Sequence, residues 1–297
     1  MKIICTGNLG FVGKETQKLL EENGHEVIGF DIMENKSILD LAQLEKCVQE
    51  TRPDRILHLA AVARFEEADR DVLLALETNA MGTMNVARIA GKHHIGVVYA
   101  STGSVLMPIL ETPPLTEKFR GCGNSNYGCT KFQGEEYIRK FAHPWIILRF
   151  SHLIGAEKRF HGLVGGFLSR IEKGLKPTLN GGRQSNDFLY VKDVARANML
   201  ALTASWDKWG QIYNVGTGIE ITDKEAGELV CKVFGYKGKI DVVAQRTVDP
   251  ERFVFDVSKA DRMLKFKAMW SFENALLDMK KEMDKKSVDS LLKNGTK

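Results

Sequence analysis

Three side chains in the first half of the sequence are of the types that move a proton to or from a hydroxyl group. Tyr127 and Lys131 lie four residues apart, which places both on one face of a helix. A free tyrosine titrates near ~10, so it becomes a base at neutral pH only where a nearby positive charge favours the phenolate. Lysine supplies such a charge, and the upstream Thr102 has a hydroxyl that can hold the reacting oxygen. The pattern predicts proton transfer at a hydroxyl or keto carbon.

A glycine-rich turn near the start of the chain predicts the partner for this chemistry. Gly7, Gly10 and Gly13 stand between an apolar segment and a helical pattern. In that setting the first glycine allows a tight turn, the second lets a pyrophosphate approach the backbone closely, and the third lets the helix pack closely. The amino end of the helix favours the negatively charged phosphates. Asp31 ends the next apolar segment, where an acid accepts bonds from ribose hydroxyls and repels a 2′-phosphate. We therefore expect a nicotinamide dinucleotide, and NAD rather than NADP.

Alternating strand and helix patterns are expected to position these residues. The sequence predicts strands over residues 2–6, 26–30, 55–59, 96–100 and 145–149, with helices after residue 10 and over 71–93 and 127–141. This alternation is typical of a Rossmann α/β fold, in which helices cover both faces of a doubly wound parallel sheet. Ligands then bind at the carboxyl ends of the strands, which is where the chemical residues fall.

The pattern loosens after residue 155, and a smaller lobe is expected there. We assign residues 1–155 to a dinucleotide-binding domain with returning elements at about 184–215. Residues 156–183 and 216–297 are assigned to a substrate-binding lobe. Within it, Thr222 and Glu225 form a capping box that predicts the start of a helix.

Composition excludes several other classes of protein. Of the 297 residues, 43% are hydrophobic, which is enough for a globular core, and the net charge of +4 is spread along the chain rather than gathered as nucleic-acid binding requires. Five cysteines without a CxxC pair favour a reducing cytoplasm over a disulfide framework. Neither an HExxH motif nor a membrane-length apolar run is present, so we expect no metal site and no membrane partner.

Taken together, the motifs resemble those of the extended short-chain dehydrogenases/reductases, in the group of NAD-dependent sugar epimerases and dehydratases. The matching stretches span nearly the whole chain: Thr6-Gly7-x-x-Gly10-x-x-Gly13, His58-Leu-Ala-Ala61, Asn79-x-x-Gly82-Thr83, Ser101-Thr102, Tyr127-x-x-x-Lys131, Asp187-Phe188, Tyr213-Asn-Val-Gly-Thr-Gly218 and Asp256-Val-Ser-Lys-Ala260.

The resemblance implies a role for particular residues. Thr102, Tyr127 and Lys131 match the catalytic set. The residues that would line the cofactor are Gly7, Gly10, Phe11, Val12, Gly13, Asp31, Asp40, Leu41, Leu59, Ala60, Ala61, Asn79, Tyr127 and Lys131. Among them, Asp40 and Leu41 would lie by the adenine. The family also implies a homodimer that pairs through the helices over 71–93 and 127–141.

Several departures from the family pattern bear on the substrate. The 4,6-dehydratases carry Asp-Glu directly after the threonine, whereas this chain has Gly103-Ser104, which argues against dehydration. Asn186 replaces an arginine that often contacts the nucleotide diphosphate, and His152 stands where an asparagine often touches the sugar. Besides Thr102, we take His152, Asn186 and Arg252 as the candidate substrate contacts.

Two enzymatic hypotheses follow, with one alternative outside catalysis. The first is an epimerase that oxidises a sugar or nucleotide-sugar transiently to a keto intermediate. The second is a net dehydrogenase or reductase of a sugar, a uronate or a hydroxy amino acid, similar to threonine 3-dehydrogenase. The third is a dinucleotide-sensing regulator, which the presence of both Tyr127 and Lys131 disfavours.

Overall fold

The computed structural model describes residues 1–109, 112–118, 121–157, 162–244 and 250–294, with side chains up to residue 285. The first half contains β1 (Lys2–Thr6), α1 (Phe11–Glu22), β2 (Glu26–Phe30), η1 (Ile32–Glu34), α2 (Leu41–Thr51), β3 (Arg55–His58), α3 (Phe65–Arg70), α4 (Val72–Leu76), η2 (Glu77–Gly82), α5 (Thr83–Lys92), β4 (Gly96–Thr102), η3 (Gly103–Leu106), α6 (Asn126–Phe141) and β5 (Trp145–Phe150). The second half contains β6 (His152–Ile154), α7 (Gly162–Glu172), β7 (Thr178–Asn180), β8 (Ser185–Asn186), β9 (Phe188–Tyr190), α8 (Val191–Leu202), η4 (Trp206–Lys208), β10 (Gln211–Val215), β11 (Ile221–Thr222), α9 (Asp223–Phe234), β12 (Asp241–Val243), β13 (Arg252–Phe253), α10 (Ser258–Leu264) and α11 (Phe272–Asn294).

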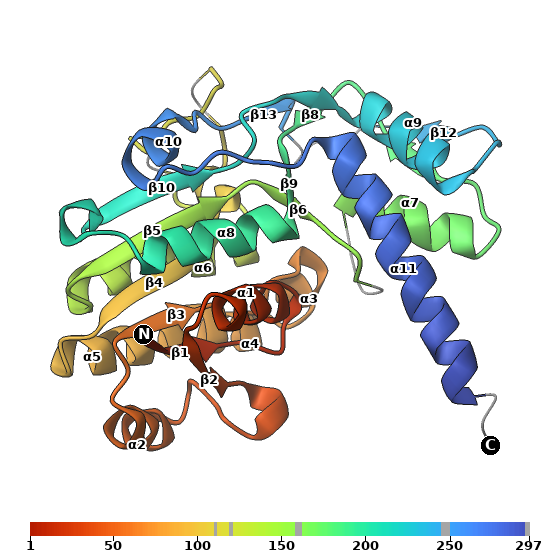
Figure 1. The fold of residues 1–297 in the computed structure, drawn as a ribbon. Helices are drawn as coiled ribbons and strands as arrows, with labels where there is room; N and C mark the ends of the chain where they lie inside the picture. Colours follow the sequence, from red (N-terminus) through yellow and green to blue (C-terminus); the bar gives the residue numbers. More distant parts are fainter. Residues whose placement is uncertain (110–111, 119–120, 158–161, 245–249, 295–297) are drawn as a thin grey trace.

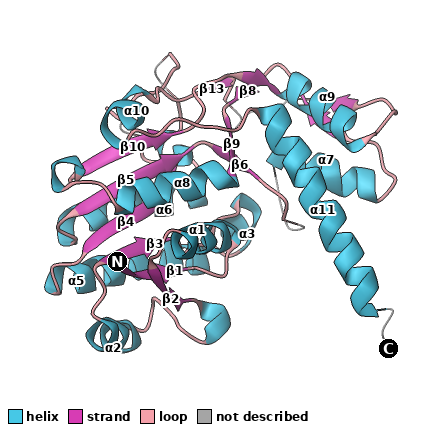
Figure 2. Ribbon diagram, in the orientation of Figure 1, coloured by secondary structure: helices cyan, strands magenta, loops and turns pink. Residues whose placement is uncertain are grey.

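A six-stranded parallel sheet forms the centre of the fold, in the order β10-β5-β4-β3-β1-β2. Figure 1 shows α1 and α8 on one face of this sheet, and Figure 2 shows the same layers by secondary structure. The expected doubly wound α/β fold is therefore confirmed. Because the strands are parallel, their carboxyl ends meet at one edge, where the motifs of the sequence gather.

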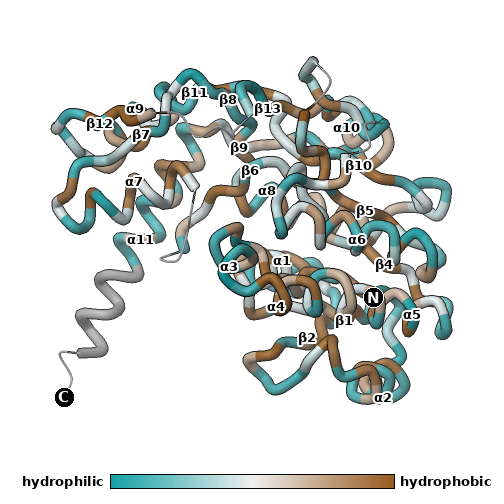
Figure 3. The backbone as a smooth tube through the Cα atoms, turned by 180° about the vertical axis from the view of Figure 1, so that it is seen from behind, coloured by the Kyte–Doolittle hydropathy of each residue, from teal (hydrophilic) through white to brown (hydrophobic). Residues whose placement is uncertain are grey.

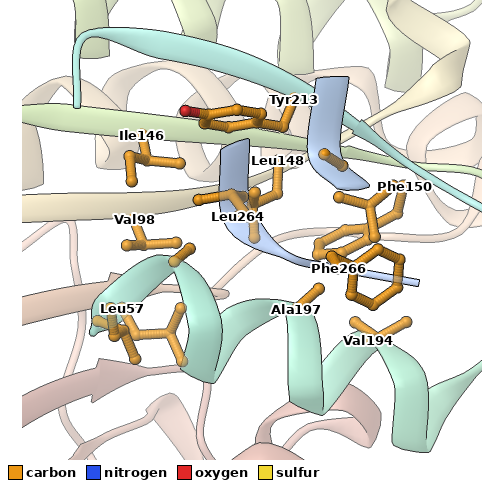
Figure 4. Close-up of a cluster of buried hydrophobic side chains, with 14 of the residues drawn as sticks. Leu57, Val98, Ile146, Leu148, Phe150, Val194, Ala197, Tyr213, Leu264 and Phe266 are labelled. Atoms are coloured by element: carbon orange, nitrogen blue, oxygen red, sulfur yellow. The ribbon is translucent and has the colours of Figure 1, made fainter. Parts of the chain in front are cut away.

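Alternate side chains of each strand enter two different cores, as a parallel sheet covered on both faces requires. Val98 belongs to the core on the α8 side, together with Leu57, Ile146 and Val194 of α8 (Figure 4). Its neighbour Val97 belongs to the opposite core, beneath α2, α5 and α6. Burial on both faces makes the strands continuous hydrophobic runs, and this is why the sequence identified them.

The helix expected over residues 71–93 is interrupted by a change of helix type. Its chain passes from α4 through a π-helical turn, η2, into α5. Gly82 closes this turn, and a Cβ at that position would come within 2.5 Å of the Ile38 side chain. Turns of this type are frequent at functional sites, and here η2 carries Asn79.

The second half of the chain builds smaller sheets around the edge where the strands end. β10 pairs with β5 in the large sheet, whereas β8 pairs with β11 and β13, β7 with β12, and β6 with β9. The expected capping box is confirmed at the start of α9, where Thr222 and Glu225 exchange hydrogen bonds. The division at residues 155, 184 and 215 stays a prediction.

One buried carboxylate joins α8 to the segment before α11. Asp193 accepts hydrogen bonds from the backbone N–H groups of Met269 and Trp270 and from Arg196. From there α11 extends past α7 and α9 towards the C-terminus, as the view from behind in Figure 3 also shows. Among the described residues, we find no helix with the length and apolar character that crossing a membrane requires.

Candidate active site

The glycine-rich turn has the geometry that a dinucleotide needs. Gly7 has a φ of 72°, and a Cβ there would lie 2.7 Å from the backbone nitrogen of Ala60, while one at Gly13 would lie 2.2 Å from the carbonyl oxygen of Gly7. Gly10 differs, because its Cβ would meet only that same carbonyl, at 3.1 Å, and the residue is exposed. Gly10 begins α1 without a side-chain cap. The turn therefore leaves an open backbone surface at a helix amino end, which fits a pyrophosphate.

Asp31 fixes the turn as well as facing the expected ribose position. Its carboxylate accepts hydrogen bonds from the backbone N–H groups of Leu9 (3.0 Å) and Met33 (2.9 Å) and is 7% exposed. A carboxylate has about four acceptor positions, so two backbone bonds leave it able to accept ribose hydroxyls. Its predicted contact with the adenosine ribose stays a prediction.

Asn79 holds the loop that follows β3 in place. Its side-chain oxygen accepts the N–H of Val62, and its amide donates to the carbonyl of Val62 and to Thr130. The side chain is completely buried. Asn79 thus holds the segment that follows Leu59, Ala60 and Ala61, whose close approach to Gly7 places it beside the glycine turn.

Thr102 and Tyr127 are brought together at the carboxyl end of β4. The Thr102 hydroxyl lies close enough to Tyr127 to lower the pKa of the phenol, and it donates a hydrogen bond to the Ser104 hydroxyl at 3.2 Å. Ser125 caps α6 through the N–H of Gly128, which sets the start of the helix that carries Tyr127. The structure therefore joins the two oxygens that the sequence assigned to one reacting group.

Lys131 lies one turn after Tyr127, buried against the face of an aromatic ring. Its Nζ is 4.2 Å from the centre of the Tyr99 ring, and the residue is 3% exposed. Burial lowers the pKa of Lys131 to about 7, although Glu135 opposes this shift. The lysine is therefore close to half-charged at neutral pH, which is unusual for an amine.

The sequence-based expectation that Lys131 lowers the pKa of Tyr127 is not met. Burial raises the pKa of Tyr127 to about 12, and the nearby Thr102 hydroxyl offsets only part of this rise. The reason is physical: removing the phenol from water penalises the phenolate, while the same burial weakens the charge on the lysine that was to stabilise it. The pair therefore rests as a protonated phenol beside a partly neutral amine.

His58 is a structural residue. Its ring nitrogens lie 2.7 Å from the Thr6 hydroxyl and 2.9 Å from the Thr83 hydroxyl, and the ring stacks on Tyr99. Burial, with a contribution from Lys131, lowers the pKa of His58 to about 3. The imidazole is neutral at physiological pH and supports the ring on which the lysine lies.

An aromatic cluster connects the substrate lobe to the catalytic threonine. A Cβ on Gly103, the residue after Thr102, would come within 2.2 Å of the Phe253 ring, so Phe253 packs directly against this loop. His152 is exposed and meets Phe253 edge-on, at 5.1 Å between ring centres. The predicted substrate residue His152 therefore lies one aromatic ring away from the catalytic loop.

The other two predicted substrate residues are already bonded within the lobe. Asn186 donates to Asp223 at 2.7 Å, at the start of α9. Arg252 forms a two-point ion pair with Glu220, at 2.7 and 2.6 Å, and Ser185 donates to the same carboxylate. This pairing lowers the pKa of Glu220 to about 2, because Arg252 stabilises the carboxylate. Any anion that Arg252 binds must therefore compete with Glu220.

Asp40 and Leu41 lie at the amino end of α2. The Asp40 side chain accepts the N–H of Gln43 and caps α2, and both Asp40 and Leu41 are exposed. Leu41 lines a shallow hollow of about 390 Å³ together with Arg88 and Phe141. Their contact with the adenine stays a prediction without geometric support from these neighbours.

Sequence reasoning missed four residues that the structure places around the catalytic set: Tyr99, Ser104, Glu135 and Phe253. Glu135 was detectable, because it follows Lys131 by four residues on the same helix face. Phe253 was not, since more than 100 residues separate it from Gly103. Within the described residues, no group of three or more His, Cys, Asp and Glu side chains gathers as a metal site would.

Comparison with known proteins gives consistent matches over the whole chain. A family model described as the NAD-dependent epimerase/dehydratase family matches residues 3–216. A putative UDP-glucose 4-epimerase of Methanocaldococcus jannaschii is 28% identical, over 88% of this chain and 92% of the relative. A dTDP-glucose 4,6-dehydratase of Salmonella typhimurium is 25% identical, over 93% and 91%.

Solved structures agree with these relatives. The UDP-glucose 4-epimerase of Thermotoga maritima, determined with UDP-glucose, is 26% identical and has a TM-score of 0.87, covering 97% of this chain and 100% of that one. The enzyme of the same name from Thermus thermophilus, in complex with NAD, is also 26% identical, with a TM-score of 0.80 and coverage of 93% and 97%.

Proposed function

Because the chain belongs to the NAD-dependent epimerase/dehydratase family, we propose that it is an epimerase that inverts a hydroxyl-bearing carbon of a sugar or nucleotide-sugar. The observation that carries this proposal is that Thr102 at the end of β4 lies close to Tyr127 on α6, with Lys131 one helical turn further on. These groups stand at the strand ends, next to a glycine turn that suits the dinucleotide. The named relatives that act on UDP-glucose support a nucleotide-sugar as the substrate.

The residues of the chain perform the proton part of this reaction. Bound NAD supplies the hydride acceptor and donor. Thr102 holds the substrate hydroxyl by a hydrogen bond, and Tyr127 acts in its phenolate form: it takes the hydroxyl proton as the carbon is oxidised and returns that proton to the same oxygen afterwards. Lys131, in its ammonium form, provides a positive charge that favours this phenolate over the phenol that burial alone would leave. No net oxidation results, because proton and hydride both return to the substrate.

The residues after Thr102 favour epimerisation over loss of water. Elimination needs an acid and a base at the sugar, and the two positions that follow Thr102 are Gly103 and Ser104, which do not titrate near neutral pH. The Ser104 hydroxyl is instead bonded to Thr102. This arrangement extends the hydrogen-bonding surface for a hydroxyl without adding an acid–base pair.

The experiment that tests the proposal follows isomer composition and NADH together. The purified chain is incubated with NAD and a panel of nucleotide-sugars, free sugars, uronates and threonine. We expect one sugar or nucleotide-sugar to interconvert with its epimer without lasting absorbance at 340 nm. Steady accumulation of NADH as substrate disappears would instead identify a net dehydrogenase.

A matched pair of variants on α6 ties the activity to the site. Tyr127→Phe removes one hydroxyl and should lower kcat by about 10²–10⁴-fold. Tyr137→Phe removes a hydroxyl from the same helix ten residues later and should leave kcat unchanged. Equal activity of the two variants would remove Tyr127 from the mechanism.

We further propose that the chain forms a homodimer through α4 and the helix beside it, α6. Val72, Leu73 and Leu76 are 48%, 63% and 36% exposed, an apolar surface that Figure 3 shows as a brown turn of helix. Apolar residues gathered in this way on a monomer mark an interaction surface. Leu73→Glu should produce monomers in analytical ultracentrifugation, whereas Val242→Glu, at an equally exposed residue of the smaller lobe, should not.

A further inference from the structure

We propose that Glu135 is a positioning residue for the catalytic groups, because its buried carboxylate ties α6 to the two strands beneath it and faces the helix side that carries Lys131. This inference rests on the proposed function of Thr102, Tyr127 and Lys131. Glu135 contacts none of the reacting atoms, so it acts through those residues rather than on a substrate.

The contacts of Glu135 join three elements at one carboxylate. Ser101 on β4 donates its hydroxyl to Oε1 at 2.5 Å, and Arg149 on β5 donates through Nε to Oε1 at 2.9 Å and through Nη2 to Oε2 at 2.6 Å. Ser101 and Arg149 are partners across the two strands. Glu135 and Arg149 are 1% and 3% exposed, so water does not weaken these bonds.

This carboxylate sets the distance between the two halves of the catalytic set. Ser101 directly precedes Thr102 in the chain, while Glu135 follows Lys131 by one helical turn. The bond from Ser101 to Glu135 therefore fixes α6, with Tyr127 and Lys131, relative to the strand end that carries Thr102. Positioning of this kind matters because displacements of about 1 Å can lower a rate by about 10²-fold.

The carboxylate also acts on the charge of Lys131. The titratable and charged groups that act on the amine are the Tyr99 ring on β4, the neutral His58 on β3 and Glu135 on its own helix, with Arg149 on β5 paired to Glu135. Glu135 raises the pKa of the amine against the effect of burial. Loss of its negative charge would remove this support and would also remove the carboxylate charge that offsets Arg149, and both changes disfavour the ammonium form.

The test compares substitutions that separate charge from position. Glu135→Gln removes the charge and keeps the size, whereas Glu135→Asp keeps the charge on a shorter arm. Ser101→Ala removes one bond and leaves the charge in place. Glu136→Gln removes a carboxylate from the next residue, which is exposed and paired with Arg139, and serves as the control.

Two readouts are measured for each variant. The first is the pH dependence of kcat and KM, in which the fall in kcat at high pH follows loss of the Lys131 proton. The second is direct titration of Lys131 in the ¹³C-lysine-labelled chain by NMR, assigned by the signal missing from Lys131→Met. The second readout needs no turnover, so it tests Glu135 even if the proposed epimerase activity is not found.

We expect Glu135→Gln to lower kcat at least tenfold with little change in KM and to move the titration of Lys131 down by about one pH unit or more. Glu135→Asp should restore the titration while kcat remains reduced, and it is the informative variant if Glu135→Gln does not fold. Ser101→Ala should lower kcat without moving the titration, and Glu136→Gln should change neither. The proposal would be overturned if the pKa of Lys131 did not move in Glu135→Gln. It would also be overturned if the pKa of Lys131 in Glu135→Asp fell as far as we expect for Glu135→Gln, in which the charge is lost.

Discussion

Replacing Lys131 with methionine should make the protein more stable while it removes activity. The lysine is 3% exposed, and burial lowers its pKa to about 7. The positive charge is therefore poorly solvated in the folded protein, which reduces the free energy of unfolding. Methionine has a similar length and can lie against the Tyr99 ring. Glu135 keeps its ion pair with Arg149 in the variant, so no new unpaired charge is created.

The magnitude follows from the difference in proton binding between the folded and unfolded chains. Lowering the pKa of an amine from its ordinary value of 10.5 to about 7 costs about 5 kcal/mol, at about 1.4 kcal/mol per pH unit. The unfolded chain binds the proton more tightly, so this cost is complete below about pH 7. It fades as pH rises towards 10.5, where the unfolded lysine also loses its proton.

The assay is urea unfolding of the wild-type chain and Lys131→Met at several pH values between 6 and 10. The free energy of unfolding of the variant should exceed that of the wild type at pH 6. The difference should shrink by about 4 kcal/mol by pH 10, because the folded lysine is then neutral and the pH is only about half a unit below the ordinary pKa at which the unfolded lysine loses its proton. Other titrating groups are common to both proteins and cancel in the difference.

A control on the same helix separates this effect from the general loss of a positive charge. Lys140 is exposed near the end of α6, and Lys140→Met should give a difference close to zero at every pH. The reasoning is refuted if Lys131→Met is less stable than the wild type at pH 6, or if the difference is the same at pH 6 and pH 10.

Three further predictions concern the turn, the buried histidine and the link to α11. Gly13→Ala should prevent folding or NAD binding, because its methyl group would lie 2.2 Å from the Gly7 carbonyl oxygen. Gly10→Ala should fold normally but bind NAD with lower affinity, which calorimetry would measure. Burial lowers the pKa of His58 to about 3, so the wild type should lose up to about 5 kcal/mol of its free energy of unfolding as pH falls from 6.5 to 3. The stability advantage of the wild type over His58→Asn should therefore narrow over that interval. A constant advantage would contradict the assignment. Asp193→Ala should cost about 3–5 kcal/mol in urea unfolding, because it removes the buried carboxylate that accepts hydrogen bonds from Arg196 and from two backbone N–H groups; a loss below about 1 kcal/mol would argue against this role.

Much of the fold could be read from the sequence because the large sheet is built from local signals. The strands 2–6 and 26–30 were predicted with the bounds that the structure has. The helix over 71–93 was predicted as one element, and its π-helical turn was missed. That turn depends on the contact of Gly82 with Ile38, which no local pattern reveals.

The sequence by itself determined those parts of the site in which the interacting residues are neighbours. The glycine turn, the Tyr127–Lys131 spacing and the capping box at Thr222 each depend on residues within one or two turns of chain, so backbone geometry alone relates them.

Only the tertiary structure decided how these groups behave. It placed Phe253 against the loop after Thr102, although the two segments lie far apart in the sequence. It also joined Arg252 to Glu220, a pair that no sequence pattern indicates. It also set the charges, raising the pKa of Tyr127 where the sequence suggested a decrease. Burial is a property of the packed chain, and removal from water is what decides whether a phenol or an amine keeps its proton.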